Sequence, residues 1–242
     1  MRIEKEAIAA YAESLQPVAL VPATDRAFSL QLNAINFGSG WFPTLRKLPG
    51  LSGFRTVEAQ FREHAAFSPE QLAGMDQTLI ARTLNQDPNH PLMALYAKAL
   101  NEIAGVEPHG DAVQIAEQLA ELPTWHDPGF FKRAQIAAAD LTTENVGRLT
   151  IFADNLVPHV LKLDGILSFA PDLDARIDRE ELLGHGSAEE VEIRACAVHA
   201  AELLVAAHGA TTAARLDHLL WNRGAQARYK ARPRHRARTT AY

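Results

Sequence analysis

The stretch SAEEVEIRACAVHAAELLVAAHG, residues 187–209, decides the fold class of this chain. It opens with Ser187 and has Glu190 three positions later, which is the spacing of a capping box at a helix start. No Pro or Gly interrupts it before Gly209, and glycine readily adopts the left-handed conformation that ends many helices. The stretch therefore predicts a long helix from Glu189 to about Ala207. The buried face of this helix would carry three apolar residues, Ile193, Ala197 and Leu204.

Helix signals continue throughout the chain, mostly as capping residues or as a Pro at a first helical position. The predicted helices are Ile3–Leu15, Asp25–Phe37, Val57–Ala66, one opened by Ser68, one opened by Pro91, one capped by Asp111 to about Glu121, Asp127–Asp140, Glu144–Asp154, Pro158–Gly165 and Ala213–Asn222. Strand-like alternation is scarce, and Phe54–Val57 is its best instance. The chain is therefore predicted to be all-α. We expect one compact helical domain over residues 1–242 with a basic tail over residues 223–242.

Composition narrows the class of protein. Hydrophobic residues make up 47% of the 242 residues and charged residues 22%, which allows a sizeable core and excludes a mainly disordered chain. The single cysteine, Cys196, excludes an intrachain disulfide, and the histidines lack HxxxH and HExxH spacing, so we expect no metal and no cofactor. The charged N-terminus and the lack of a long apolar run predict a cytoplasmic protein without a membrane span.

Charge is unevenly distributed along the chain. Residues 223–242 hold seven Lys and Arg and no Asp or Glu, whereas the other 222 residues hold 17 basic and 29 acidic residues, a net charge of −12. An acidic body disfavours broad nucleic-acid binding, which requires a positive face. We expect no stable complex with nucleic acid.

Asp154 ends the apolar run Leu149–Ala153 and stands shortly before Pro158. A carboxylate in that position would be partly desolvated, as many catalytic acids are. The same Asp can instead cap the helix that Pro158 opens, by accepting hydrogen bonds from free backbone N–H groups. The pattern alone leaves both interpretations open.

Two further segments carry cations beside apolar residues. In the segment Phe130–Gln135, Lys132 follows two aromatic residues and suits a phosphate site or a solvated basic helix face. Arg194 lies one helical turn after Glu190, so an ion pair within the long helix is the simplest interpretation of its position.

The segment Asn36–Phe42 places Phe37, Trp41 and Phe42 around a glycine turn. Aromatic faces near such a turn suit stacking on a planar base. They equally suit a core, where most large aromatic side chains lie. The Gly38-Ser39-Gly40 sequence is not a dinucleotide-binding motif, because no strand is predicted before it.

Six blocks in order resemble the queuosine salvage proteins, which are queuosine 5′-phosphate N-glycosylases. They are residues 32–37 (LNAINF), 131–136 (FKRAQI), 150–154 (TIFAD), 190–194 (EVEIR), 219–221 (LLW) and 233–242 (PRHRARTTAY). The resemblance implies an all-α fold related to helix-hairpin-helix DNA glycosylases. It further implies hydrolysis of the N-glycosidic bond of queuosine 5′-phosphate, with release of queuine for reuse in transfer RNA.

The resemblance also implies roles for individual residues. The catalytic aspartate of the family falls on Asp154, which favours the catalytic interpretation of this residue. Lys132 would be a cation on the phosphate or sugar side, and Arg194, Arg234, His235 and Arg238 would bind phosphate or hold the tail over the site. The walls around the base would come from Phe37, Trp41, Phe152 and Trp221. We also expect the tail from Pro233 to Tyr242 to be ordered and to pack near Asp154.

The sequence departs from the family pattern at positions that bear on which base the protein recognises. Gly38-Ser39-Gly40 interrupts an aromatic-rich segment of the family, and Asn222 stands where the family usually has Asp. An amide both donates and accepts hydrogen bonds whereas a carboxylate only accepts, so a related deazapurine ribonucleotide is an alternative substrate. A glycosylase acting on nucleic acid and a non-catalytic nucleotide-binding protein are the alternative functions.

Overall fold

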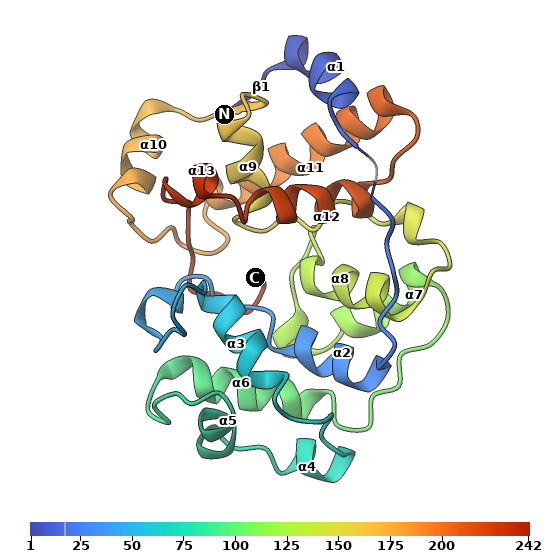
Figure 1. The fold of residues 1–242 in the computed structure, drawn as a ribbon, viewed down its shortest axis with the longest axis vertical. Coiled ribbons are helices and arrows are strands. Elements are labelled where there is room, and N and C mark those ends of the chain that lie inside the picture. The colour runs from blue at the N-terminus through green and yellow to red at the C-terminus, as the bar shows by residue number, and fades with distance from the viewer. Residues whose placement is uncertain (17) are drawn as a thin grey trace. The chain divides into compact units, whose positions relative to one another are not determined.

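The computed structural model describes residues 1–16 and 18–242, which are all-α as predicted, apart from a two-stranded sheet and an isolated bridge between Leu182 and Arg236 (Figure 1). The chain forms two compact units. Unit 1 comprises Met1–Val21 and Asn145–Ala237, and unit 2 comprises Pro22–Glu144 and Arg238–Tyr242. The organisation into one domain stays a prediction, and each unit is described by itself.

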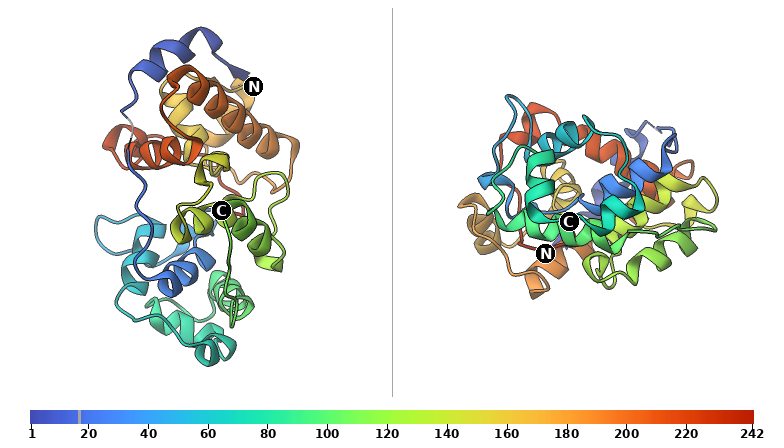
Figure 2. Two further views of the ribbon diagram at one scale, coloured as in Figure 1. Left: turned by 90° about the vertical axis from the view of Figure 1, so that its right-hand side faces the viewer. Right: turned by 90° about the horizontal axis from the view of Figure 1, so that it is seen from below.

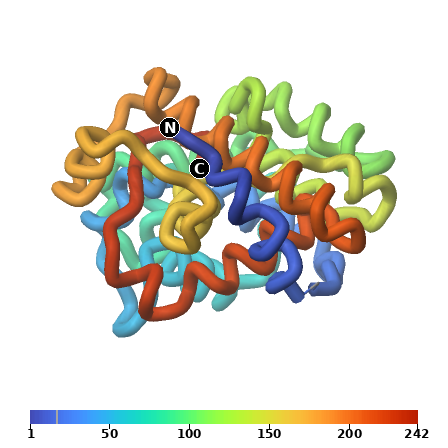
Figure 3. Tube along the Cα trace, turned by 90° about the horizontal axis from the view of Figure 1, so that it is seen from above, coloured from blue at the N-terminus to red at the C-terminus, as the bar shows by residue number. Residues whose placement is uncertain are grey.

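Unit 1 is built around the long helix predicted from residues 187–209. Its elements are β1 (Arg2–Ile3), α1 (Lys5–Glu13), η3 (Val146–Arg148), α9 (Val157–Leu163), β2 (Leu167–Ser168), α10 (Pro171–Asp178), α11 (Ala188–His208), α12 (Ala213–Arg223) and α13 (Ala227–Lys230). The first helix, α1, lies along α11, as Figure 3 shows from above. Three residues predicted to face the core from α11 are fully buried: Ile193, Ala197 and Leu204. The short strands β1 and β2 pair antiparallel, with Arg2 opposite Ser168.

A polar cluster around Asp164 joins four helices of unit 1. Its carboxylate accepts hydrogen bonds of 2.6 Å from the hydroxyls of Tyr11 and Tyr229, and it pairs with Arg223 at 3.0 Å and Arg228 at 3.3 Å. Asp164 follows α9, and its partners come from α1, α12 and α13. Two phenols and two guanidinium groups thus satisfy a carboxylate whose side chain is only 6% exposed. The cluster fixes the segment that leads into the tail.

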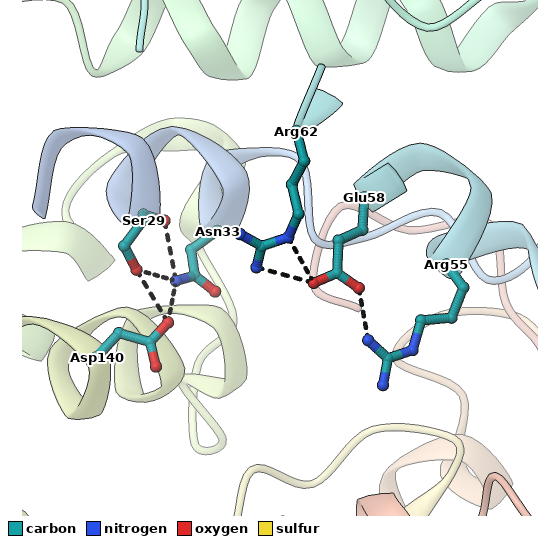
Figure 4. Close-up of polar contacts among 6 residues, drawn as sticks. All are labelled: Ser29, Asn33, Arg55, Glu58, Arg62 and Asp140. Carbon is teal, nitrogen blue, oxygen red and sulfur yellow. Dashed lines mark hydrogen bonds and ion pairs between the residues drawn. The ribbon is translucent and has the colours of Figure 1, made fainter. Parts of the chain in front are cut away.

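Unit 2 contains α2 (Arg26–Ala34), η1 (Phe42–Thr44), α3 (Gly53–Phe61), α4 (Pro69–Ala73), α5 (Gln77–Thr83), α6 (Pro91–Glu102), α7 (Ala112–Ala120), η2 (Pro123–Trp125) and α8 (Lys132–Leu141). Helix α8 packs along both α7 and α2 (Figures 1 and 2). The α2–α8 contact has a polar centre, where Asp140 accepts hydrogen bonds from Ser29 Oγ at 3.0 Å and Asn33 Nδ2 at 2.8 Å (Figure 4). The same view shows Glu58 between Arg55 and Arg62 on and directly after α3, an arrangement that stabilises the exposed end of this short helix.

Most predicted caps are confirmed. Asp25 accepts a hydrogen bond from Phe28 N, and both Ser68 and Asp111 form complete capping boxes. Ser187 accepts from Glu190 N, but the predicted box is incomplete because the Glu190 carboxylate bonds to Gly186 N and Arg194 instead of to Ser187 N.

Phe54–Val57, the best instance of strand-like alternation, lies inside α3, in keeping with the all-α prediction. Some predicted helices have other bounds than the observed ones. The helix expected from Asp127 begins only at Lys132, because Phe131 adopts a left-handed conformation with φ of 51°. The helix expected over Glu144–Asp154 shrinks to η3: Asn145 is left-handed at its start, and the backbone after Arg148 turns extended and bonds to side chains of other helices.

No helix in the described part of the chain has both the length and the apolar character that crossing a membrane requires.

Candidate active site

The backbone before Asp154 is extended and held from two sides in unit 1. Asp217 on α12 accepts a hydrogen bond from Phe152 N at 3.2 Å through Oδ1. Arg194 on α11 donates from Nε to the Ala153 carbonyl at 2.9 Å. Since all these residues except Asp154 are buried, the two hydrogen bonds replace the helical ones that this segment lacks. They fix the position of the backbone from which Asp154 projects.

The hydrogen bonds of the Asp154 carboxylate bear on both roles that the sequence left open, helix capping and catalysis. Oδ1 accepts hydrogen bonds from Leu156 N at 2.6 Å and from Val157 N at 3.1 Å, so it caps the start of α9. Oδ2 accepts no hydrogen bond from residues 1–16 and 18–242. The side chain is half-buried. One oxygen therefore orients the carboxylate while the other is open to a ligand.

Arg194 belongs to a buried ion pair. Its side chain is 1% exposed and pairs at 3.4 Å with Glu190, whose side chain is 0% exposed. The Glu190 Oε2 atom accepts from Gly186 N at 3.0 Å, and His185 Nδ1 lies 3.6 Å from Oε1. Because a buried charge must be paired and hydrogen-bonded, this arrangement makes Arg194 a supporting residue for the Asp154 backbone.

The tail reaches the same loop through a backbone carbonyl. Asn155 Nδ2 donates to His235 O at 3.1 Å, and both residues are buried. One residue further along, Leu183 N donates to Arg236 O at 2.9 Å, and the Arg236 guanidinium pairs with Glu180 at 3.3 Å. Residues 235–236 are thus held against unit 1 on both sides.

His235 and His159 are uncharged near neutral pH. Burial lowers the pKa of His235 to about 3, and the charges of Arg194 and Arg234 act in the same direction. Burial also lowers the pKa of His159, whose Nε2 lies 2.8 Å from the Tyr229 carbonyl, a bond that opposes the shift. A neutral His235 does not bind a phosphate through charge.

Arg234 differs from its neighbours in the tail. It is partly buried and makes no hydrogen bond or ion pair with a described residue. Burial lowers its pKa, and the negative charge of Asp154 acts against that shift. Arg234 therefore brings a positive charge within electrostatic reach of the Asp154 carboxylate.

The remaining predicted residues of unit 1 occupy different environments. Phe152 is 6% exposed and contributes to the core. Trp221 is half-buried and Asn222 is exposed, both on α12. Asp217 lies on the same helix and was not predicted from the sequence. A signal for it existed, since an acid three positions before Leu220 falls on the buried face of that helix, where acids need a partner.

The other predicted residues lie in unit 2. Lys132 is 5% exposed, and its Nζ donates to Asn36 O at 3.4 Å, which brings it to the loop that carries Phe37 and Trp41. Phe37 is buried with its ring against Tyr96 in an edge-to-face contact, whereas Trp41 is half-buried. Arg238 is exposed.

Arg133, directly after Lys132, organises this loop. Its guanidinium lies between the rings of Phe37 and Trp125, 4.5 and 4.4 Å from their centroids. It donates to four carbonyls, those of Asn33, Ala34, Thr124 and Thr240. The last of these belongs to the tail, and Gly38 N donates to Tyr242 O at 3.0 Å. Stacking and hydrogen bonds thus hold residues 240–242 against unit 2.

His, Cys, Asp and Glu side chains do not gather anywhere in the described part of the chain as a group of three or more that could hold a metal ion.

Comparison with known proteins supports the resemblance. Residues 125–242 match the family model described as queuosine salvage protein. Proteins named queuosine 5′-phosphate N-glycosylase/hydrolase from Sphaerobacter thermophilus and Dictyostelium discoideum are 42% and 35% identical over 127 residues, or 47% of this chain. A protein of that name from Mus musculus is 34% identical over 85 residues. The resemblance to the queuosine salvage proteins is therefore confirmed.

The matches have limited extent. They cover 39% of the Sphaerobacter protein and 40% of the Dictyostelium protein, so the chain spans about two fifths of the length of these relatives. The family model includes Lys132, Asp154, Arg194 and the tail, whereas Phe37 and Trp41 lie before the part that it matches.

Proposed function

We propose that this protein is an N-glycosyl hydrolase that cleaves queuosine 5′-phosphate and releases queuine for salvage. The observation that carries the proposal is the half-buried Asp154 carboxylate, with one oxygen fixed by two backbone N–H groups and the other open, inside the part that matches the family. Relatives over this part are named as enzymes acting on that nucleotide.

The chemistry suits a single fixed carboxylate. Cleavage of a glycosidic bond develops positive charge on the sugar, and a carboxylate held in place stabilises that charge without reorganising. The open oxygen of Asp154 can also accept a proton from the attacking water. The departing base takes up the bonding electrons and a proton, and hydrogen bonds to its edges assist its release.

Further substrate contacts are part of this proposal. Lys132 is assigned to the phosphate or sugar side, Phe37, Trp41, Phe152 and Trp221 to the walls around the base, and Asn222 to its edge. The substrate is a free nucleotide in the cytoplasm, because the acidic body disfavours a nucleic-acid strand. Asn222 is exposed on α12, so its amide is accessible to a ligand.

The proposal is tested by incubating the protein with queuosine 5′-phosphate, queuosine and ordinary purine nucleotides and measuring the free base by chromatography. We expect release from queuosine 5′-phosphate and little from the ordinary purine nucleotides. Release from duplex or single-stranded nucleic acid alone would instead support a glycosylase of the base-flipping class. Binding without release from any substrate would support a nucleotide-binding protein.

Asp154→Asn separates catalysis from capping. The amide oxygen still accepts from Leu156 N and Val157 N, so the cap is retained, but the negative charge is lost. We expect a folded protein with turnover reduced about 10²- to 10⁴-fold. Asp76→Asn is the matched control, since Asp76 only caps α5 through Leu79 N. Near-normal turnover in folded Asp154→Asn would reduce Asp154 to a helix cap.

A further inference from the structure

The start of helix α9 carries the two backbone amides that orient the Asp154 carboxylate. These are Leu156 N and Val157 N, and Pro158 after them has no N–H group to add. With only seven residues, Val157–Leu163, α9 is too short to be stable by itself. Its position, and with it the direction of the Asp154 carboxylate, must therefore be set by contacts with other elements of unit 1.

The first turn of α9 packs mainly through apolar side chains. Val157, Val160 and Leu161 are at most 2% exposed, and His159 between them is 5% exposed. Apolar burial stabilises such a turn without fixing a direction, because the hydrophobic effect is non-directional. His159 is the polar side chain among these residues, and a buried polar group is costly unless it is hydrogen-bonded. Its hydrogen bond can therefore fix the orientation of the turn where the apolar contacts cannot.

Tyr229 on α13 is the partner of His159 and holds α9 at two points. Its carbonyl oxygen lies 2.8 Å from His159 Nε2. A carbonyl oxygen only accepts hydrogen bonds, so Nε2 carries the hydrogen and donates it. The phenol of the same tyrosine donates to Asp164, directly after α9, at 2.6 Å. Tyr229 is itself only 4% exposed, so it holds both the first turn and the end of α9 against a buried side chain.

The chain that follows α13 extends this support toward Asp154. Helix α13 packs against α9 (Figure 1), and further along the tail the His235 carbonyl accepts from Asn155 Nδ2 at 3.1 Å. Residues 229–235 thus run in the opposite direction to residues 155–164 and bond to them before α9, in its first turn and at its end. Of these contacts, the one at His159 acts on the turn whose amides hold the carboxylate.

We infer that His159 is a positioning residue for the reaction: its hydrogen bond to the Tyr229 carbonyl fixes the first turn of α9 and thereby the direction of the Asp154 carboxylate. This inference rests on the proposed function and deepens it. Because His159 is buried and acts through α9, its loss should lower turnover and leave binding of the nucleotide nearly unchanged.

The test measures kcat and KM for release of base from queuosine 5′-phosphate in two variants of this position. His159→Leu removes the donor, and we expect kcat to fall about 10- to 100-fold with KM nearly unchanged, the scale expected when a catalytic group is slightly misplaced. His159→Gln keeps an N–H donor on a side chain of similar reach, so it should recover most of the lost kcat. Asn101→Leu is the matched control, because it removes hydrogen bonds from a half-buried side chain to the carbonyls of Leu72 and Met75 in unit 2. We expect its kcat to be unchanged.

Three results would overturn the inference: a kcat for His159→Leu as high as that of Asn101→Leu, a loss that appears in KM instead of kcat, or an equal loss of kcat in His159→Gln. If His159→Leu does not fold, His159→Asn takes its place, because its shorter amide does not reach the Tyr229 carbonyl. If the unmodified protein releases no base, the proposed function fails, and hydrogen exchange at Leu156 N and Val157 N decides the positioning separately. Both amides must then exchange faster in the variant without the donor than in His159→Gln and Asn101→Leu. Equal exchange rates would overturn the positioning role as well.

Discussion

Arg194→Met probes how the scaffold holds Asp154. The substitution removes the hydrogen bond to the Ala153 carbonyl and leaves Glu190, which is 0% exposed, without its guanidinium. Breaking a buried ion pair from one side costs about 3–5 kcal/mol because the remaining charge is uncompensated. For a chain of this size each kcal/mol lowers Tm by about 2–4 °C, so we expect a decrease of about 6–20 °C.

A double variant distinguishes the two roles of Arg194. In Glu190→Gln/Arg194→Met the orphaned charge is gone, so most of the lost stability should return. Turnover should be low, because the Ala153 carbonyl still lacks its donor while the bond from Phe152 N to Asp217 is retained. Thermal melts and the base-release assay measure the two effects. Arg176→Met is the control, since Arg176 pairs with the more exposed Glu181 and Glu189 and its loss should change stability little.

Two results would refute this reasoning. If Arg194→Met lowers Tm no more than Arg176→Met does, removing the guanidinium leaves no costly uncompensated charge on Glu190. Full turnover in the folded double variant would show that the hydrogen bond to Ala153 does not position Asp154.

Three further predictions concern the cations and the tail. Lys132→Ala should weaken the nucleotide more than the nucleoside in the base-release assay, whereas equal losses would place Lys132 at the sugar or in the scaffold. Deletion of residues 234–242 should lower both Tm and turnover, because it removes buried residues such as His235, Ala237 and Tyr242; unchanged values would make the tail a solvated appendage. The folded pKa of His235, about 3 against 6.5 unfolded, means that stability is lost as pH falls below 6.5, by about 2 kcal/mol at pH 5. His235→Gln should flatten that decline in denaturation curves, and an equally steep decline would contradict it.

Local signals made the all-α class and most helix starts predictable. Ser68, Asp111 and Pro91 act through hydrogen bonds or ring geometry within a few residues of themselves, so their effects are visible in a short window of sequence. The buried face of α11 was predictable for the same reason, because its period is a property of one helix.

The segment from Glu144 to Asp154 was not predictable in this way. Its extended course depends on Asp217 and Arg194, which lie 65 and 41 residues from the atoms that they bind. No pattern within the segment identifies partners at that distance. The late helix start after Phe131 was not predictable for a related reason. A bulky residue with positive φ is unfavourable by itself. Phe131 tolerates this conformation because Asp127 accepts hydrogen bonds from the backbone on both sides of it.

Capping and catalysis do not compete at Asp154, although the sequence presents them as alternatives. A carboxylate has two oxygens, and a cap occupies only one of them here. A free surface aspartate samples several rotamers, whereas one bound to Leu156 N and Val157 N presents its second oxygen in a fixed direction. The cap is therefore the element that preorganises the proposed catalytic group. On this argument Asp154→Ala, which loses cap and charge together, should lower stability by about 0.5–2 kcal/mol, whereas Asp154→Asn loses activity at nearly constant stability.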